Sequence, residues 1–382
     1  MRAMPDYSDI EKWMIENATF PYPFMKGLNL SELFYREAVR PIMEESFSDL
    51  IYSAALIGSG SEVLGFDTEQ SMDHDWGPRL YLFLDPSDFN PYSKVLDETF
   101  RKKLPREIRG VPTGTVLINN GPNMLLPVDE GEEINHMITF TTSRVYFSEY
   151  LGFDPLSEIS VTDWLVTSQQ CLRSIATGRV FHDGLGELKP IVDKLQYYPH
   201  DLWLYLLANQ WNRISQEEGF VGRTGQVNDE LGSRIVASRL IRDIMNLCFL
   251  MEKTYAPYIK WVGTGFAQLK CSDMLTPLFH QIMDATTWQE RQNSLVKVYE
   301  FIAEKHNDLG ITAPLDTRPS NFRNRPFLVI RGDKFAEAIF ETIQDEKIRC
   351  LPRYLGSVDQ FSDSTDLLSY PQKLKRCRAL YE

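Results

Sequence analysis

Two groups of residues in the first quarter of the chain have types and a spacing that suit chemistry on a nucleotide. The first group is Gly58, Ser59, Gly60 and Ser61, and the second is Asp73 and Asp75. Glycines let backbone N–H groups approach a phosphate closely, and serines add hydroxyl groups. Two neighbouring carboxylates suit Mg²⁺, which takes one or two of them together with phosphate oxygens and water. The two groups therefore predict a triphosphate in the glycine-serine turn and Mg²⁺ on the aspartates.

Two strands must position these groups. The apolar run 54–57 predicts a strand that ends at the turn, and a second strand is predicted over 74–84. Side chains alternate along a strand, so Asp73 and Asp75 are expected to share one face with Arg79. Arg79 could then reach phosphate or pair with a neighbouring acid. His74, between the aspartates, is expected to be a packed or surface histidine.

The same residues also have an ordinary explanation. With 53 acidic residues in 382, roughly seven acid-x-acid triplets are expected by chance, and a glycine-serine turn is commoner still. The order of the pieces favours a site: a strand, a small-residue turn, a spacer, and two carboxylates before another strand.

Gly58-Ser59, a spacer and Asp73-His74-Asp75 resemble the signature of the nucleotidyltransferase superfamily, which includes DNA polymerase beta and the antibiotic nucleotidyltransferases. These residues lie within the longer string GSGSEVLGFDTEQSMDHDWGPRL (58–80). Together with the strings at 198–223 and 229–261, it is similar to one bacterial branch of unknown function. That branch has a nucleotidyltransferase-like N-terminal half and a helical C-terminal half. The resemblance implies an NTP substrate, expected to be ATP, with its β- and γ-phosphates on Gly58–Ser61 and Mg²⁺ on Asp73 and Asp75.

One departure from the superfamily pattern bears on turnover. Members usually carry a third carboxylate on a neighbouring strand, and the matching strand here is predicted at 136–142. The position expected to be acidic is Thr139. An acidic run at 129–133 lies just upstream, but charge runs usually form solvated loops. The site is therefore expected either to borrow a base from the helical half or to bind nucleotide without turning it over.

The helical half contains a polar cluster with candidate partners for the site. Arg213 and Arg223 could clamp phosphates, since guanidinium groups bind them with two parallel hydrogen bonds. Glu217 or Glu218 could act as general base on an acceptor hydroxyl or amine, as the helical domain does in the antibiotic-modifying relatives. The alternative for each residue is an ion pair on an exposed helix face.

Composition limits the partners. The net charge of −13 makes the chain a poor general binder of nucleic acid or anionic membrane. Its five cysteines are widely separated, which disfavours a disulfide framework and suits a cytoplasmic protein. No signal peptide and no apolar run of spanning length is evident.

The pattern along the chain predicts an α+β protein in two domains. A nucleotidyltransferase-like domain with a mixed sheet and flanking helices is expected at 1–155, and a mainly helical, acceptor-binding domain at 156–382. Residues 85–97 are expected to be loop-like, and helices are predicted at 92–103, 163–175, 201–217, 230–252, 285–305 and 333–345. The leading interpretation is a nucleotidyltransferase that modifies a small molecule. The alternatives are a nucleotide-binding protein with little or no turnover, an enzyme that modifies a protein side chain, and a structural or partner-binding protein whose glycine-serine turn binds nothing.

Overall fold

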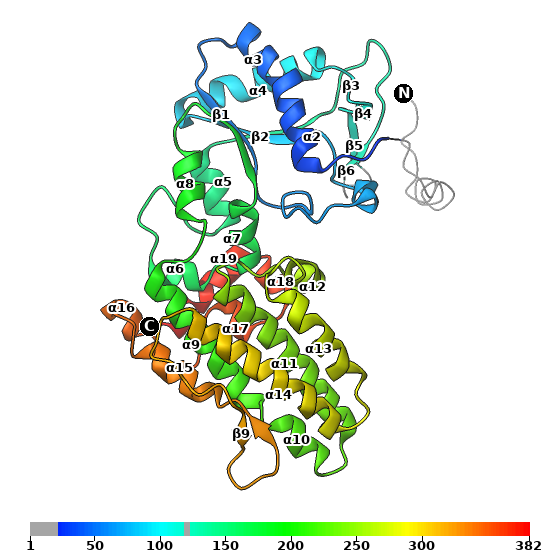
Figure 1. The fold of residues 1–382 in the computed structure, drawn as a ribbon. Coiled ribbons are helices and arrows are strands. Elements are labelled where there is room, and N and C mark those ends of the chain that lie inside the picture. The colour runs from blue at the N-terminus through cyan, green and yellow to red at the C-terminus, as the bar shows by residue number, and fades with distance from the viewer. Residues whose placement is uncertain (1–21, 118–122) are drawn as a thin grey trace. The chain divides into compact units, whose positions relative to one another are not determined.

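The structure is a computed structural model that describes residues 22–117 and 123–382. The described residues form two compact units (Figure 1). The first unit comprises 22–150, 154–157 and 174–196, and the second comprises 151–153, 158–173 and 197–382. The first unit contains a mixed sheet with flanking helices and the second is mainly helical, which confirms the predicted α+β class.

A four-stranded sheet forms the centre of the first unit. In chain order its strands are β1 (Tyr52–Leu56), β2 (Arg79–Leu84), β7 (Met137–Thr141) and β8 (Arg179–Asp183). The spatial order is β7-β2-β1-β8. The first strand, β1, runs antiparallel to both of its neighbours, whereas β2 and β7 are parallel. The turn that follows β1 therefore lies at the same end of the sheet as the start of β2.

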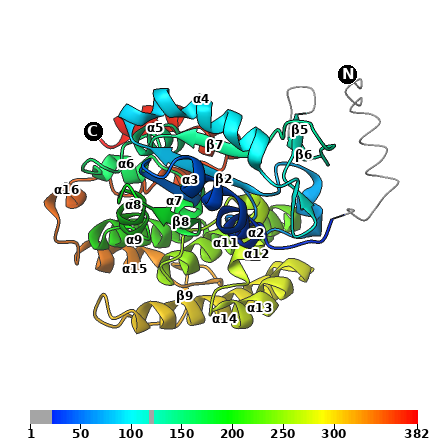
Figure 2. The ribbon, with the colours of Figure 1, turned by 90° about the horizontal axis from the view of Figure 1, so that it is seen from above.

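Helices cover one face of this sheet. They are α2 (Gly27–Phe34), a π-helical turn η1 (Tyr35–Val39), α3 (Arg40–Ser46) and α4 (Pro86–Lys103) (Figure 2). Leu80 and Leu82 of β2 share a buried core with Phe34 and Phe100. The π-helical turn ends at Val39, two residues before Pro41, which cannot donate the regular helical hydrogen bond.

The opposite face carries α5 (Ser143–Tyr150), whose Tyr146 ring packs against Tyr81 and Phe83. Thr139 of β7 remains exposed on this face. Short elements surround the sheet: η2 (Glu69–Asp73), β3 (Glu107–Ile108), β4 (Val111–Pro112), β5 (Thr115–Leu117) and β6 (Asn123–Leu125).

The chain leaves the first unit and then returns to it. After α6 (Val161–Leu165) and α7 (Gln169–Ala176), β8 pairs with the open edge of β1, and α8 (Leu188–Lys194) follows. Asp183 accepts a hydrogen bond from the Ser53 hydroxyl at 2.8 Å and caps α8 through the Lys189 N–H at 2.9 Å. The predicted division into 1–155 and 156–382 misses this return. The predicted helix 163–175 is two helices, because Ser160 caps a separate first turn.

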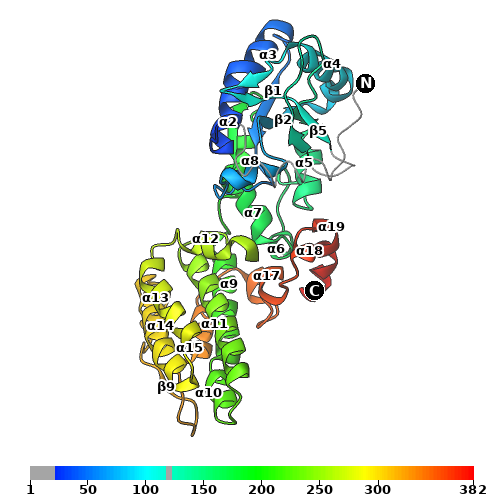
Figure 3. The ribbon, with the colours of Figure 1, turned by 90° about the vertical axis from the view of Figure 1, so that its right-hand side faces the viewer.

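The second unit is a bundle built around α9 (His200–Glu217), in which 12 of 18 residues are buried (Figure 3). Around it are α10 (Phe220–Gly225), α11 (Glu230–Met251), η3 (Ile259–Trp261), α12 (Val262–Phe266), α13 (Ser272–Asp284), α14 (Trp288–Asp308) and α15 (Gly332–Phe340). Smaller elements are β9 (Ser320–Asn321), β10 (Leu328–Val329), α16 (Glu346–Arg349), α17 (Val358–Phe361), α18 (Thr365–Leu368), α19 (Pro371–Leu374) and η4 (Lys375–Leu380).

Caps explain where several helices begin. Asp229 accepts from the Gly232 N–H at the start of α11, and Thr287 forms a capping box with Glu290 at the start of α14. The segment 85–97, expected to be loop-like, is helical instead. Asp85 caps α4 and Pro86 occupies its first turn, so residues that also signal a turn here start a helix. Among the described helices, none combines the length and apolar character needed to cross a membrane.

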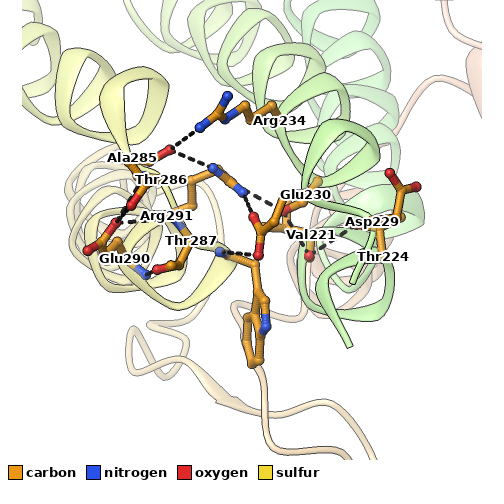
Figure 4. Close-up of polar contacts among 12 residues, drawn as sticks. Val221, Thr224, Asp229, Glu230, Arg234, Ala285, Thr286, Thr287, Glu290 and Arg291 are labelled. Carbon is orange, nitrogen blue, oxygen red and sulfur yellow. Dashed lines mark hydrogen bonds and ion pairs between the residues drawn. The ribbon is translucent and has the colours of Figure 1, made fainter. Parts of the chain in front are cut away.

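A buried arginine joins α11 to α14. The Arg291 side chain is 0% exposed and forms an ion pair with Glu230 (Figure 4). Its guanidinium also donates to the Ala285 carbonyl at 2.8 Å and to the Ser233 hydroxyl at 3.1 Å. Burial lowers the pKa of Arg291, and the Glu230 carboxylate opposes that shift. The negative charge of Glu230 thus offsets part of the free-energy cost of burying the Arg291 guanidinium.

Glu230→Gln is expected to lower the free energy of unfolding by about 1–3 kcal/mol, because it leaves the buried Arg291 guanidinium without a counter-charge, although Glu230 itself is 37% exposed. Chemical denaturation measures the loss. Asp308→Asn is the control, since it removes the partner of Lys305 from an exposed pair and should cost less than about 1 kcal/mol. Equal losses in the two variants would contradict the buried-pair interpretation.

Candidate nucleotide site

The glycine-serine turn begins where β1 ends, and its backbone demands glycine at two positions. Gly58 and Gly60 have φ values of 93° and 136°, a region that other residues rarely adopt. A Cβ atom on Gly58 would also collide with the Tyr146 hydroxyl. That hydroxyl donates to the Ile57 carbonyl at 2.9 Å and so fixes the last residue before the turn.

The turn presents donors that have no acceptor within the described parts of the chain. Gly58 N–H donates to the Ser174 carbonyl at 3.1 Å, but the next three N–H groups make no such bond. These three belong to Ser59, Gly60 and Ser61. The Ser59 and Ser61 hydroxyls likewise have no hydrogen-bond partner among residues 22–117 and 123–382, and Ser59 is exposed. Successive free N–H groups in a turn form a concave surface that favours an anion.

Arg79, the first residue of β2, lies against this turn. Its Nε donates to Glu62 Oε1 at 2.7 Å, and its Nη2 donates to the Ser59 carbonyl at 2.5 Å. Burial lowers the pKa of Arg79, but the adjacent Glu62 carboxylate more than offsets this, so that the pKa rises. Of the two predicted alternatives for Arg79, the structure therefore has the pairing with a neighbouring acid rather than an arginine extended toward phosphate.

Glu62 was not identified from the sequence as a site residue, although it directly follows Ser61. Its side chain is 4% exposed. The Glu62 carbonyl accepts from Gly65 N–H at 3.1 Å, and the Ser61 carbonyl accepts from Phe66 N–H at 2.9 Å, so tight turns hold this segment. Tyr146 was also missed, because its position depends on how α5 packs and no local signal reports that.

The strand geometry predicted for the two aspartates is wrong. Asp73 is the last residue of η2, Asp75 has a left-handed φ of 51°, and β2 begins only at Arg79. Alternation along a strand therefore does not relate the two side chains. A capping box formed by Thr68 and Ser71 starts the 3₁₀ turn instead. Gly77 and Pro78 then separate the aspartates from the strand.

Each aspartate nevertheless keeps one carboxylate oxygen available. Asp75 Oδ1 accepts from Asn123 N–H at 2.9 Å and from Asn123 Nδ2 at 3.2 Å, and Asp73 Oδ1 lies 3.0 Å from His74 Nδ1. The second oxygen of each has no partner within the described residues. His74 is 56% exposed, as expected of a surface histidine. Asp75 lies four positions before Arg79 in the chain, so their Cα atoms lie within about 14 Å.

The register of β2 and β7 places Thr139 beside Tyr81. This is the sheet face that also carries Arg79, because alternate residues of β2 share a face. The exposed position beside Tyr81 on the neighbouring strand is thus a threonine. No cluster of three or more His, Cys, Asp or Glu residues suited to a metal ion occurs in the described parts of the chain.

The arginines predicted to clamp phosphates have other partners in the helical unit. Arg213 Nε lies 3.2 Å from the buried Asp243 carboxylate, and its Nη1 donates to the Gln360 carbonyl. The exposed Arg223 guanidinium lies 5.5 Å from the centre of the Phe220 ring. The Arg213 contacts join α9 to α11 and α17, which is a structural role.

The two glutamates predicted as general bases are also engaged within the helical unit. Glu217 forms an ion pair with Arg239 at 2.7 Å. Glu218 accepts from the Ile330 N–H at 2.9 Å and from the Arg331 N–H at 3.1 Å, directly before α15. Burial raises the pKa of Glu218 to about 8, although these backbone donors lower it. The contacts are those of a helix cap and an ion pair, and they lend no support to a catalytic base.

Comparison with known proteins gives one family match. Residues 164–262 match the model described as Domain of unknown function (DUF4037). This range contains both helical strings on which the resemblance to a family of unknown function rests, and it does not include the glycine-serine turn or the aspartates. No curated protein matches the chain.

A solved structure of a nucleotidyltransferase-like protein from Exiguobacterium sibiricum 255-15 is similar to this chain. The sequence identity is 11%, the TM-score is 0.31, and the match covers 75% of this chain and 82% of that one. At this distance the likeness carries no inference about activity.

Gly58→Ala is expected to destabilise the protein more than Gly65→Ala. Both glycines have positive φ, which costs a substituted residue about 1–2 kcal/mol. A Cβ atom at Gly65 has nothing within 4 Å, whereas at Gly58 it displaces the Tyr146 hydroxyl from Ile57. Thermal and chemical denaturation of the two variants measure the difference. Equal destabilisation would show that Tyr146 does not constrain the turn.

Glu218→Gln is expected to gain stability relative to wild type as the pH rises. The raised pKa means that the folded protein holds a proton that the unfolded chain has released. Wild type should therefore lose up to about 1.4 kcal/mol per pH unit from pH 4.5 to about 8. The glutamine keeps an acceptor oxygen and does not titrate. Denaturation midpoints at several pH values test this, with Glu217→Gln as control, and a pH-independent difference would contradict it.

Proposed function

We propose that the first unit binds a nucleoside triphosphate, expected to be ATP, and that the protein is a Mg²⁺-dependent nucleotidyltransferase. The observation that supports this most is the turn at Gly58–Ser61. Three of its N–H groups and two of its hydroxyls have no partner among the described residues, and such groups suit phosphate oxygens. The sequence of the turn and of the following aspartates resembles the nucleotidyltransferase signature. Together they favour a triphosphate whose β- and γ-phosphates lie on the turn.

Asp73 and Asp75 are the residues that would hold Mg²⁺. Each has one carboxylate oxygen free within the described residues, and Mg²⁺ needs only one or two carboxylates when phosphate and water complete its shell. Bound there, the ion would neutralise charge on the triphosphate and favour departure of pyrophosphate.

The proposed reaction is attack by an acceptor hydroxyl or amine on the α-phosphorus. A bond from phosphorus to the acceptor forms, the α–β bridging bond breaks, and pyrophosphate leaves with the electron pair. The acceptor proton passes to solvent or to the leaving group. The N–H groups of Ser59, Gly60 and Ser61 would hold the leaving phosphates in place throughout. The net charge of −13 favours a small-molecule acceptor over nucleic acid.

A second candidate function is nucleotide binding with little or no turnover. It is favoured by Thr139, which occupies the exposed position beside Tyr81 where the superfamily pattern has a third carboxylate. A threonine cannot share a metal ion with the aspartates as a carboxylate does. This candidate keeps the phosphate-binding role of the turn and removes the transfer step.

Replacing Asp73 and Asp75 by asparagine together is expected to reduce pyrophosphate release more than about 100-fold, since residues that merely support metal ligands already change activity 10–100-fold. The assay supplies Mg²⁺, a labelled NTP and a panel of small hydroxyl and amine acceptors. Asp129→Asn with Glu130→Gln is the control, because it removes two charges from an exposed loop.

The outcomes separate the candidates. Release by wild type and control, but not by Asp73→Asn/Asp75→Asn, supports the transferase. Tight Mg-NTP binding without release by any form supports the second candidate. If the wild-type protein binds no Mg-NTP at millimolar concentration, both candidate functions are wrong.

A further inference from the structure

We propose that Arg79 and Glu62 form a positioning pair that holds the Ser59–Gly60 peptide group in its phosphate-binding orientation, and that neither side chain contacts the nucleotide. This inference rests on the proposed function of the turn and adds a role for two residues behind it. It starts from the fact that Arg79 directs its guanidinium at a backbone carbonyl of the turn.

Arg79 Nη2 donates a hydrogen bond to the backbone carbonyl of Ser59 at 2.5 Å. In a trans peptide the carbonyl and the following N–H point in opposite directions. Fixing the Ser59 carbonyl toward Arg79 therefore directs the Gly60 N–H away from Arg79, to the side on which it has no acceptor among the described residues. Without this bond the peptide could rotate and remove a donor from the middle of the turn.

Glu62 fixes the guanidinium itself. Arg79 Nε donates to Glu62 Oε1 at 2.7 Å, and Nη2 is paired with the same oxygen. The Glu62 side chain is 4% exposed and that of Arg79 is 16% exposed, so the pair is largely buried. A planar guanidinium held by its Nε edge keeps the direction of its other donors.

Gly60 shows how closely the pair supports the turn. A Cβ atom there would meet the Arg79 guanidinium and would lie 2.5 Å from Glu62 Oε2. Gly60 also has a φ of 136°, which glycine adopts without strain. The Gly60 backbone therefore lies in close contact with the side chains of the Arg79–Glu62 ion pair.

A double-mutant cycle tests the inference, with Mg-ATP affinity measured by calorimetry and folding checked by thermal melts. Arg79→Gln and Glu62→Gln are each expected to weaken binding at least tenfold. The double variant should bind about as weakly as either single variant rather than a hundredfold weaker, because one unit is lost in each case. The matched control is Arg40 and Glu44 on α3, whose Nε and Oε1 atoms are also 2.7 Å apart, and their exchange for glutamine should leave affinity unchanged.

Affinity of Glu62→Gln within twofold of wild type, with Arg79→Gln weakened, would overturn the inference and make Arg79 a phosphate contact. Unchanged affinity in all variants would overturn it as well. If a single variant does not fold, the double variant decides, because it leaves no unpaired buried charge.

A second measurement uses the wild-type protein alone. The NMR resonance of the Arg79 Nε–H should stay protected and unshifted when Mg-ATP binds, and a large shift would contradict a positioning role. Wild type that binds no Mg-ATP would overturn the proposed function together with the inference.

Discussion

The orientation of the peptide group between Ser59 and Gly60 is the constraint on which the proposed site depends. Arg79 fixes this orientation by donating to the Ser59 carbonyl, and Glu62 holds the Arg79 guanidinium in place. On the strand side of the turn, the Tyr146 hydroxyl donates to the Ile57 carbonyl. A buried ion pair contributes little net stability compared with apolar packing, because desolvation offsets its attraction. Its value here is geometric, since it fixes the direction of a backbone donor.

The sheet supplies the frame for that constraint. Because β1 and β2 are antiparallel, the end of one and the start of the other meet, and this brings Arg79 to the turn. Because β2 and β7 are parallel, Thr139 comes to the same face beside Tyr81. Leu80, Leu82 and Leu84 of β2 point to the other face and share a core with α2 and α4. One face thus forms part of the core, and the other carries α5, Arg79 and the exposed Thr139.

Regular patterns in the sequence predicted the elements that strong local signals define. The apolar run after residue 53 and the alternating run around Thr139 correspond to β1 and β7. Helical periodicity predicted the ends of α9 and α11 to within one residue. The return strand β8 was not predicted, since its partner lies about 125 residues earlier and no local pattern reports that pairing.

The site was predictable only in part, for the same reason. Glycines and serines in a row identify the turn, but the partners of a charged side chain depend on tertiary packing. Arg79 forms an ion pair with Glu62 and donates to a backbone carbonyl, and Arg213 forms an ion pair with Asp243. Glu218 accepts from backbone N–H groups directly before α15. The strand assumed for Asp73 and Asp75 failed because a 3₁₀ turn and Gly77-Pro78 intervene before β2. Charge type and spacing alone did not distinguish structural pairing from ligand binding.

The central claim is that the turn after β1 holds a triphosphate. A crystal structure of the protein with Mg²⁺ and a non-hydrolysable ATP analogue tests it most directly. The account predicts phosphate oxygens within hydrogen-bonding distance, about 2.7–3.2 Å, of the N–H groups of Ser59, Gly60 and Ser61. A nucleotide bound elsewhere, with this turn free of phosphate, would contradict it.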